Sequence, residues 1–218
     1  MTTSPSGKEE RLRFPGVRAP KPLLSAEAER QLGARQLELL DELEEKLLGE
    51  GLADLTMAEI AALLRCSLRT LYGIAPSKDE LLLTIVDRRL RCIGRDAIEA
   101  LRTSMPPLDA LRTYLRAANA AVQPETLALS ANLAKVAGAG RLFDAHETYL
   151  TAVTQSLLDR AVDEGEIAAV DTAAVAHVLA GLGREFARPE VAEIAQASPK
   201  ETADAISEVI LQGLLAKR

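Results

Sequence analysis

From residue 26 onward, apolar side chains recur at every third or fourth position of the chain. This period gathers them on one face of a helix, whereas a half-buried strand would alternate apolar and polar residues. Aromatic residues make up only 3% of the chain, and runs of Val, Ile, Tyr and Thr, which favour strands, are missing. The chain is therefore predicted to be all-α, with about nine helices.

The breaks in this pattern contain residues that begin or end helices. Thr56 and Glu59 have the spacing of a capping box, which predicts a helix starting at Met57. Ser67 is a predicted N-cap, and Gly165 is a predicted C-terminal residue in the left-handed conformation. Together these signals predict helices over residues 26–50, 57–64, 68–73, 78–104, 108–122, 125–137, 141–164, 171–187 and 199–216.

Three regions follow from this organisation. Residues 1–26 contain four prolines and no period, and are predicted to form a flexible basic arm. Such an arm can follow a DNA groove or can simply be a disordered tail. Residues 27–76 form a first helical domain, and residues 77–218 form a long linking helix followed by a second helical domain.

The charge of the chain is unevenly distributed. The formal net charge is -6, but residues 56–95 carry seven basic and four acidic side chains, and residues 1–22 carry five basic and two acidic ones. A nucleic-acid-binding surface needs only a local excess of positive charge, so DNA binding is permitted. No signal peptide or membrane-spanning run is evident, and the two cysteines are too few for a disulfide framework. A cytoplasmic protein with no membrane association is expected.

The predicted helices over residues 57–64 and 68–73, joined by a tight turn, form a helix-turn-helix pattern. The first can bury Ile60, Ala61 and Leu64, while the second projects side chains toward the major groove. Around this helix lie hydroxyl, guanidinium and ammonium groups suited to phosphates and base edges. The candidate DNA-binding residues are Arg65, Ser67, Leu68, Arg69, Thr70, Tyr72 and Lys78.

Several of these side chains also have simpler interpretations. Arg69 can contact a base directly or be merely exposed to solvent, whereas Tyr72 and Lys78 are expected to contact phosphates. Cys66 in the turn is interpreted as a small packed apolar residue rather than a redox switch. A further basic face of residues 88, 91 and 95 is expected to be solvated or paired with Asp87 and Asp96.

Residues 39–83 resemble the DNA-binding domain of the TetR family of transcriptional regulators. The resemblance rests on Thr56-Met57-Ala58-Glu59-Ile60-Ala61, Ser67-Leu68-Arg69-Thr70-Leu71-Tyr72 and Pro76-Ser77-Lys78-Asp79-Glu80-Leu81-Leu82. It implies three DNA-binding helices, a linking fourth helix, and a C-terminal helical bundle for ligand binding and dimerisation. Residues 125–129 and 165–167 are similar to the C-terminal domain of AefR-like members of the family.

The chain departs from the family pattern at two places. Arg65 stands where the family usually has a glycine, so the turn can close differently or gain a phosphate contact. Ile74 and Ala75 replace a His-Phe pair whose aromatic ring normally packs the third helix on the fourth. Ala75 is therefore expected to loosen this seam unless another side chain fills it.

The C-terminal half offers polar and aromatic side chains on otherwise apolar helices, as a ligand pocket would require. Each of them could instead belong to the core or the surface. The pocket candidates are Tyr114, Asn119, Asn132, Phe143, His146, Tyr149 and His177. The last two predicted helices are apolar on more than one face, which predicts a four-helix interface between two copies. The predicted interface residues are Val175, Val178, Leu182, Ile206, Ile210 and Leu214.

We therefore expect a homodimeric, ligand-responsive regulator that a small apolar or amphipathic molecule releases from a palindromic DNA operator. The alternative is a helical ligand-binding or adaptor protein that has lost specific DNA binding. No catalytic motif is evident, so an enzyme is not expected. No cofactor is implied, and the two histidines lack the spacing of metal ligands.

Overall fold

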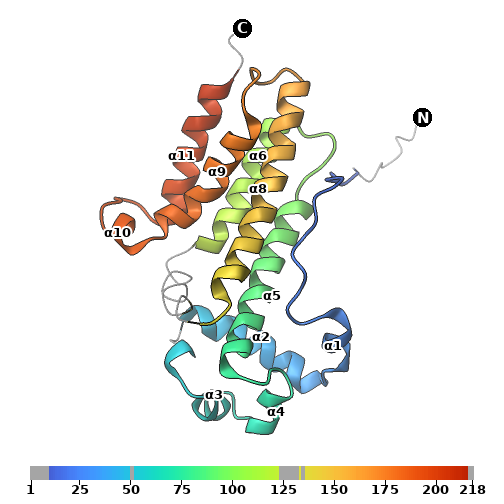
Figure 1. Cartoon of the computed structure of the whole chain (residues 1–218), viewed down its shortest axis with the longest axis vertical. Helices are drawn as coiled ribbons and strands as arrows, with labels where there is room; N and C mark the ends of the chain where they lie inside the picture. The colour runs from blue at the N-terminus through green and yellow to red at the C-terminus, as the bar shows by residue number, and fades with distance from the viewer. Residues whose placement is uncertain (1–9, 50–51, 123–132, 134–135, 216–218) are drawn as a thin grey trace, which may run out of the picture.

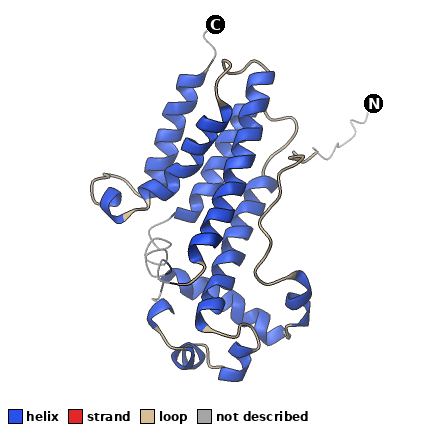
Figure 2. Ribbon diagram, in the orientation of Figure 1, coloured by secondary structure: helices blue, strands red, loops and turns tan. Residues whose placement is uncertain are grey.

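The computed structural model describes residues 10–49, 52–122, 133 and 136–215 of the chain (Figure 1). Over these residues it is built of helices and contains no strand, which confirms the predicted all-α class (Figure 2). Within the described part of the chain, strand-like backbone pairing is confined to two isolated bridges, Arg11 with Arg102 and Ile167 with Leu215. None of the described helices is both long and apolar enough to cross a membrane.

Four helices form one end of the molecule, at the bottom of Figure 1. They are α1 (Ala26–Gln31), α2 (Ala34–Gly49), α3 (Met57–Leu63) and α4 (Leu68–Tyr72), with a short 3-10 turn over Leu52–Asp54. The single helix predicted over residues 26–50 is wrong, because the chain breaks between α1 and α2. Leu32 adopts an extended backbone there, and Gln36 accepts a hydrogen bond from the N–H of Gly33 at 3.0 Å.

The remaining helices form an elongated bundle above this end (Figure 1). They are α5 (Lys78–Glu99), α6 (Pro107–Ala118), a 3-10 turn over Asn119–Val122, α8 (Ala139–Asp163), α9 (Thr172–Phe186), α10 (Pro189–Ala192) and α11 (Pro199–Leu214). The short α10 is not among the predicted helices. The helix predicted over residues 125–137 falls almost entirely outside the described residues.

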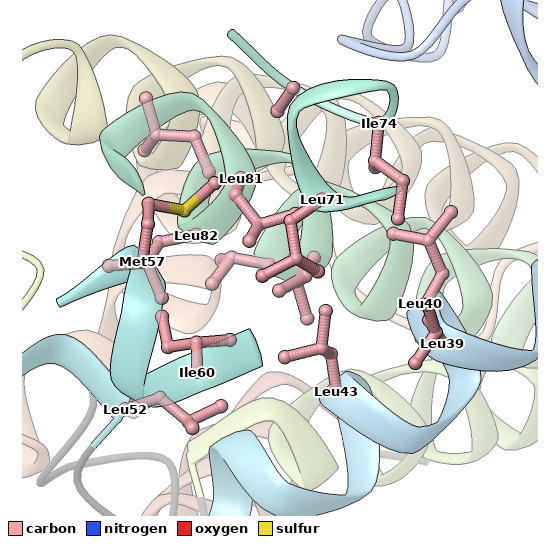
Figure 3. Packing of buried hydrophobic residues seen from close by; sticks show 14 of the residues in the cluster. Leu39, Leu40, Leu43, Leu52, Met57, Ile60, Leu71, Ile74, Leu81 and Leu82 are labelled. Carbon is pink, nitrogen blue, oxygen red and sulfur yellow. The ribbon is translucent and has the colours of Figure 1, made fainter. Parts of the chain in front are cut away.

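Two hydrophobic cores organise the molecule. The N-terminal core joins Leu39, Leu40 and Leu43 of α2 to residues of α3, α4 and α5 (Figure 3). The C-terminal core is built around α6, α8, α9 and α11, and includes Leu111 and Leu157. Full burial of each such leucine contributes roughly 1.5–3 kcal/mol, so these cores stabilise the fold.

The segment over residues 10–25, here called the N-terminal strap, packs on the bundle, so the prediction of a flexible arm is wrong for these residues. Leu12 is buried in the C-terminal core, with Phe14 and Val17 packed against it. The N–H of Leu12 donates to the carbonyl of Leu101 at 3.3 Å, and the N–H of Thr103 donates to the carbonyl of Glu10 at 3.0 Å. Apolar side chains between the prolines thus hold this segment against the bundle in an extended conformation, which proline residues can adopt.

Helix α3 ends in a left-handed turn at Arg65, whose φ is +50°. The N–H of Cys66 donates to the carbonyl of Ala61 at 2.9 Å, and that of Arg65 donates to Ala62 at 3.1 Å. This pair of bonds defines a Schellman motif, which usually places glycine where Arg65 stands. Helix α8 ends in the same way, but with Gly165 at φ +73°.

Because a side chain in the left-handed region is strained, Arg65→Gly is expected to raise the free energy of unfolding by about 0.5–1 kcal/mol. Urea denaturation at constant m-value measures this change. The reciprocal control is Gly165→Ala, which should lower stability by about 1 kcal/mol because an added Cβ meets nothing there and only the backbone is strained. A lower stability of Arg65→Gly would contradict this account of the turn.

Candidate functional site

The helix-turn-helix is fixed by side chains that cap each of its helices. At α3, the Thr56 hydroxyl accepts from the N–H of Glu59 at 3.3 Å, and the Glu59 carboxylate accepts from the N–H of Thr56 at 2.7 Å. At α4, the Ser67 hydroxyl accepts from the N–H of Thr70 at 3.1 Å. The predicted caps at both helices are therefore confirmed, and they set where each helix begins.

Burial divides α4 into an inner and an outer face. Leu71 is completely buried in the N-terminal core together with Ile60 of α3. Leu68 is 41% exposed and Tyr72 is 52% exposed, although both are apolar enough to be buried if a partner were available. Arg69 lies on this outer face as well. A short helix that shows an aromatic, an arginine and a leucine to solvent is suited to contact another molecule.

The other predicted DNA-binding residues lie around α4. Ser67 and Thr70 hydrogen-bond to each other through their hydroxyls at 2.8 Å, so both hydroxyls have an intramolecular partner. Arg65 in the turn is exposed, whereas Lys78 is half-buried at the first residue of α5. Hydrogen bonds from the Thr56 N–H and hydroxyl hold the pKa of Glu59 below its usual value, with a smaller contribution from the positive charge of Lys78.

Two residues of α2 that sequence reasoning missed support this unit from behind. The side-chain amide of Gln36 donates to the carbonyl of Thr70 at 3.3 Å, and Arg35 donates to the carbonyl of Leu64 at 3.3 Å. A Cβ added to Gly73 would lie 2.5 Å from Nε2 of Gln36, so this glycine leaves room for the contact. Their spacing along α2 gives no sign of this role, because their partners are backbone atoms about 30 residues away.

The seam between α4 and α5 is filled despite the departure from the family pattern. Ile74 and Ala75 are both buried in the N-terminal core, where Ile74 lies near Leu40 of α2 (Figure 3). Cys66 is partly buried against the same core, and burial raises the pKa of its thiol. The packed, unreactive interpretation of this cysteine is the one that its surroundings support.

The ion pairs of α5 differ from those expected from the sequence. Arg88 pairs with Glu29 of α1 and with Asp41 and Glu44 of α2, rather than with Asp87. Burial lowers the pKa of Arg88, but the hydrogen bond to Glu44 and the three negative charges outweigh it, so the pKa is raised overall. Asp87 has other partners, His146 and the backbone of Leu23. The guanidinium of Arg88 thus joins three carboxylates from two other helices.

The predicted pocket residues do not form one group. Tyr114 is buried in the C-terminal core with Tyr149 packed beside it, and desolvation raises the pKa of both phenols. The amide of Asn119 donates instead to Asp204 of α11 at 2.8 Å. His177 is exposed on α9, and Asn132 lies outside the described residues.

Two further pocket candidates lie near the first turns of α8, beside the N-terminal domain. Phe143 packs against the N-terminal core, and Nε2 of His146 lies 2.9 Å from Oδ1 of Asp87. Among the described residues, no group of three or more His, Cys, Asp or Glu side chains could hold a metal ion. The structure therefore brings together Tyr114 with Tyr149, whereas His146, one turn before Tyr149 on α8, makes its contact with Asp87 of α5.

The predicted interface residues fall on two faces of α9 and α11, which lie side by side (Figure 1). Val175, Leu182, Ile210 and Leu214 pack partly against the C-terminal core. Val178 of α9 is 51% exposed, and Ile206 and Val209 of α11 are also exposed. Val209 is not among the predicted interface residues, although it is exposed and lies one turn of α11 after Ile206.

No protein-family model and no curated protein sequence matches the chain, but many solved structures do. A TetR-family regulator from Haloarcula marismortui superposes with a TM-score of 0.69 at 21% identity, over 84% of this chain and 98% of that one. One from Agrobacterium tumefaciens superposes with a TM-score of 0.65 at 17% identity, over 84% of this chain and 98% of that one. AibR, solved in complex with isovaleryl coenzyme A and operator DNA, superposes with a TM-score of 0.58 at 19% identity, over 80% of this chain and 97% of that one.

These neighbours share both parts of the architecture, because the superpositions span nearly their whole length. The more specific likeness to AefR-like members stays a prediction. The chain has the fold of the TetR-family transcriptional regulators, with an N-terminal helix-turn-helix domain and a C-terminal helical domain.

Proposed function

We propose that this protein is a homodimeric transcriptional regulator that binds a palindromic operator through α4. The observation that carries the proposal is the division of α4, in which Leu71 is buried while Leu68, Arg69 and Tyr72 face outward. A recognition helix requires this arrangement, because it must be anchored on one side and enter the major groove with the other. The fold shared with known regulators supports the same function.

Within this proposal, the residues around α4 have different tasks. Arg69 reads a base, since a guanidinium can donate two hydrogen bonds to a guanine edge. Tyr72, Lys78, Ser67 and Thr70 bind phosphates and fix the register of the helix on DNA, and Arg65 adds a positive charge at the turn. Leu68 is exposed at the start of the helix and makes apolar contact with the DNA in the groove.

The exposed apolar face of α9 and α11 serves as the dimer interface. Val178, Ile206 and Val209 lie on this face, and two copies would pair their α9 and α11 into a four-helix interface. A two-fold axis would then place the two α4 helices about one turn of DNA apart or somewhat more, at ~34 Å or beyond. This pairing matches the palindromic symmetry of the proposed operator.

A small apolar or amphipathic effector binds within the C-terminal domain and releases the protein from the operator, and the protein acts as a repressor, which is the usual mode of the family it resembles. Tyr114 and Tyr149 offer phenol groups in otherwise apolar surroundings, the combination that an amphipathic ligand requires. AibR was solved in complex with both isovaleryl coenzyme A and operator DNA, so one neighbour with this fold combines both kinds of ligand. To empty the operator usefully, the effector must prefer the released state by a few kcal/mol.

Arg69→Ala should reduce sequence preference more than it reduces overall affinity. Loss of a bidentate contact costs about 1–3 kcal/mol of discrimination at one base pair, whereas phosphate contacts remain. Gel shifts on DNA flanking the gene, with each position of the bound site varied, measure this change. Unchanged discrimination at every position would show that Arg69 does not read a base.

Lys78→Ala should weaken binding to all DNA sequences alike. Because one phosphate contact is lost from each protomer, the slope of log K against log salt concentration should become shallower by about one unit per contact. Titrations at several salt concentrations measure this slope, and Lys200→Ala on α11 is a control at a lysine far from α4. If the wild-type protein binds no DNA at either of two salt concentrations, the alternative function as a ligand-binding or adaptor protein is favoured.

Val178→Arg should convert the dimer to a monomer, because two arginines would meet across the two-fold axis in an apolar interface. Sedimentation velocity measures the change in mass. Ile194→Arg is the matched control, since Ile194 is 79% exposed and apolar but lies in the connection between α10 and α11, outside the two helices proposed to form the interface. A dimer that survives the first change, or is lost with the second, would place the interface elsewhere.

A further inference from the structure

Three segments of the chain meet at one buried carboxylate. Asp87 lies on α5, and only 2% of its surface is exposed. Its Oδ1 lies 2.9 Å from Nε2 of His146 on α8, and its Oδ2 accepts a hydrogen bond from the N–H of Leu23 at 2.9 Å. Because a buried carboxylate is costly unless each oxygen has a partner, the two contacts depend on each other.

The contact at Leu23 belongs to the N-terminal strap immediately before the DNA-binding domain. Helix α1 begins at Ala26, three residues later. One turn farther along α5, Arg91 donates to the carbonyl of Pro20 in the strap, and Arg88 pairs with Glu29 of α1. Polar side chains of α5 therefore hold the strap and α1 in place together.

The contact at His146 belongs to the C-terminal domain. Helix α8 packs along α6 and α9, and the far end of the strap is buried in the same domain through Leu12. A movement of α8 relative to α5 would separate His146 from Asp87 and leave Oδ1 without its partner. The carboxylate would then turn toward water, and its bond to Leu23 would weaken.

We propose that Asp87 is a positioning residue that transmits a displacement of α8 to the N-terminal strap and so to α1. The link runs from His146 through the two carboxylate oxygens to the backbone of Leu23. In a regulator of the kind proposed above, it carries the effector signal from the C-terminal domain to the DNA-binding domain, and this last step rests on the proposed function. The link itself does not depend on DNA.

Trypsin measures release of the strap in the whole protein without DNA or effector. Arg18 is exposed, and the bond after it is cut only when neighbouring residues leave α5. We expect His146→Leu to raise the cleavage rate after Arg18 about tenfold, since a buried acceptor loses its donor. His146→Gln keeps an N–H donor and should restore most of the protection. His177→Leu changes the other histidine of the chain, exposed on α9, and should leave the rate unchanged.

A double-variant cycle tests whether both contacts act through Asp87. Leu23→Pro removes the backbone N–H, whereas the control Leu23→Ala keeps it and changes only an exposed side chain. If the two contacts share Asp87, Leu23→Pro combined with His146→Leu should raise cleavage by less than the product of the single effects. Equal rates in His146→Leu and His177→Leu, or single effects that multiply in full, would overturn the proposal.

A second measurement applies if His146→Leu fails to fold, which far-UV circular dichroism and rapid cleavage throughout the chain would reveal. With two histidines in the chain, their imidazole NMR signals can be assigned by substitution. Leu23→Pro should shift the His146 signal and leave that of His177 in place, and an unmoved His146 signal would overturn the link. Operator binding is measured in a separate experiment. Absence of operator binding would refute the proposed function, whereas the cleavage and NMR results would still decide whether Asp87 links His146 to Leu23.

Discussion

Helix α5 belongs to both hydrophobic cores, and the arrangement of the whole molecule depends on this sharing. Its residues 81–87 are all buried, which means that this part of the helix is covered on every side. Farther along, Ala97 lies in the C-terminal core. Because a continuous helix is stiff, the two domains cannot be placed independently, and any change in how one core packs on α5 reaches the other.

The contact between the N-terminal helix-turn-helix domain and α5 is partly electrostatic. Segment 23–55 is strongly acidic, and Arg88 brings three of its carboxylates together from α1 and α2. Two of these carboxylates stay well exposed, so the pairs contribute specificity of position more than stability. Acidic charge in this domain would repel DNA, and pairing with Arg88 offsets part of it.

Local features of the structure could be predicted from the sequence, whereas contacts between distant segments could not. Thr56 and Ser67 cap their helices as predicted, because a cap needs only the next three residues. The outward direction of Leu68 and Tyr72 follows from the helix-turn-helix motif and not from spacing, because Leu68, Leu71 and Tyr72 lie at i, i+3 and i+4, on one side of a helix. The strap could not be predicted, because Leu12 finds its partner Leu101 some 90 residues later, and prolines in an extended packed segment look like those in a disordered one.

The location of the strap also bears on how the protein would hold DNA. The strap runs beside α5 toward the C-terminal domain (Figure 1), and Arg11 pairs with Glu99 of α5 at 3.2 Å. The basic residues of the strap, within residues 10–25, are thus held away from α4. This placement argues against an arm that follows the minor groove from the strap. Arg65, Arg69 and Lys78 then supply the positive charge around α4. In the proposed dimer these are about three cations per protomer, so electrostatics alone would give a moderate salt dependence, and close packing of α4 in the groove would have to provide the rest of the affinity.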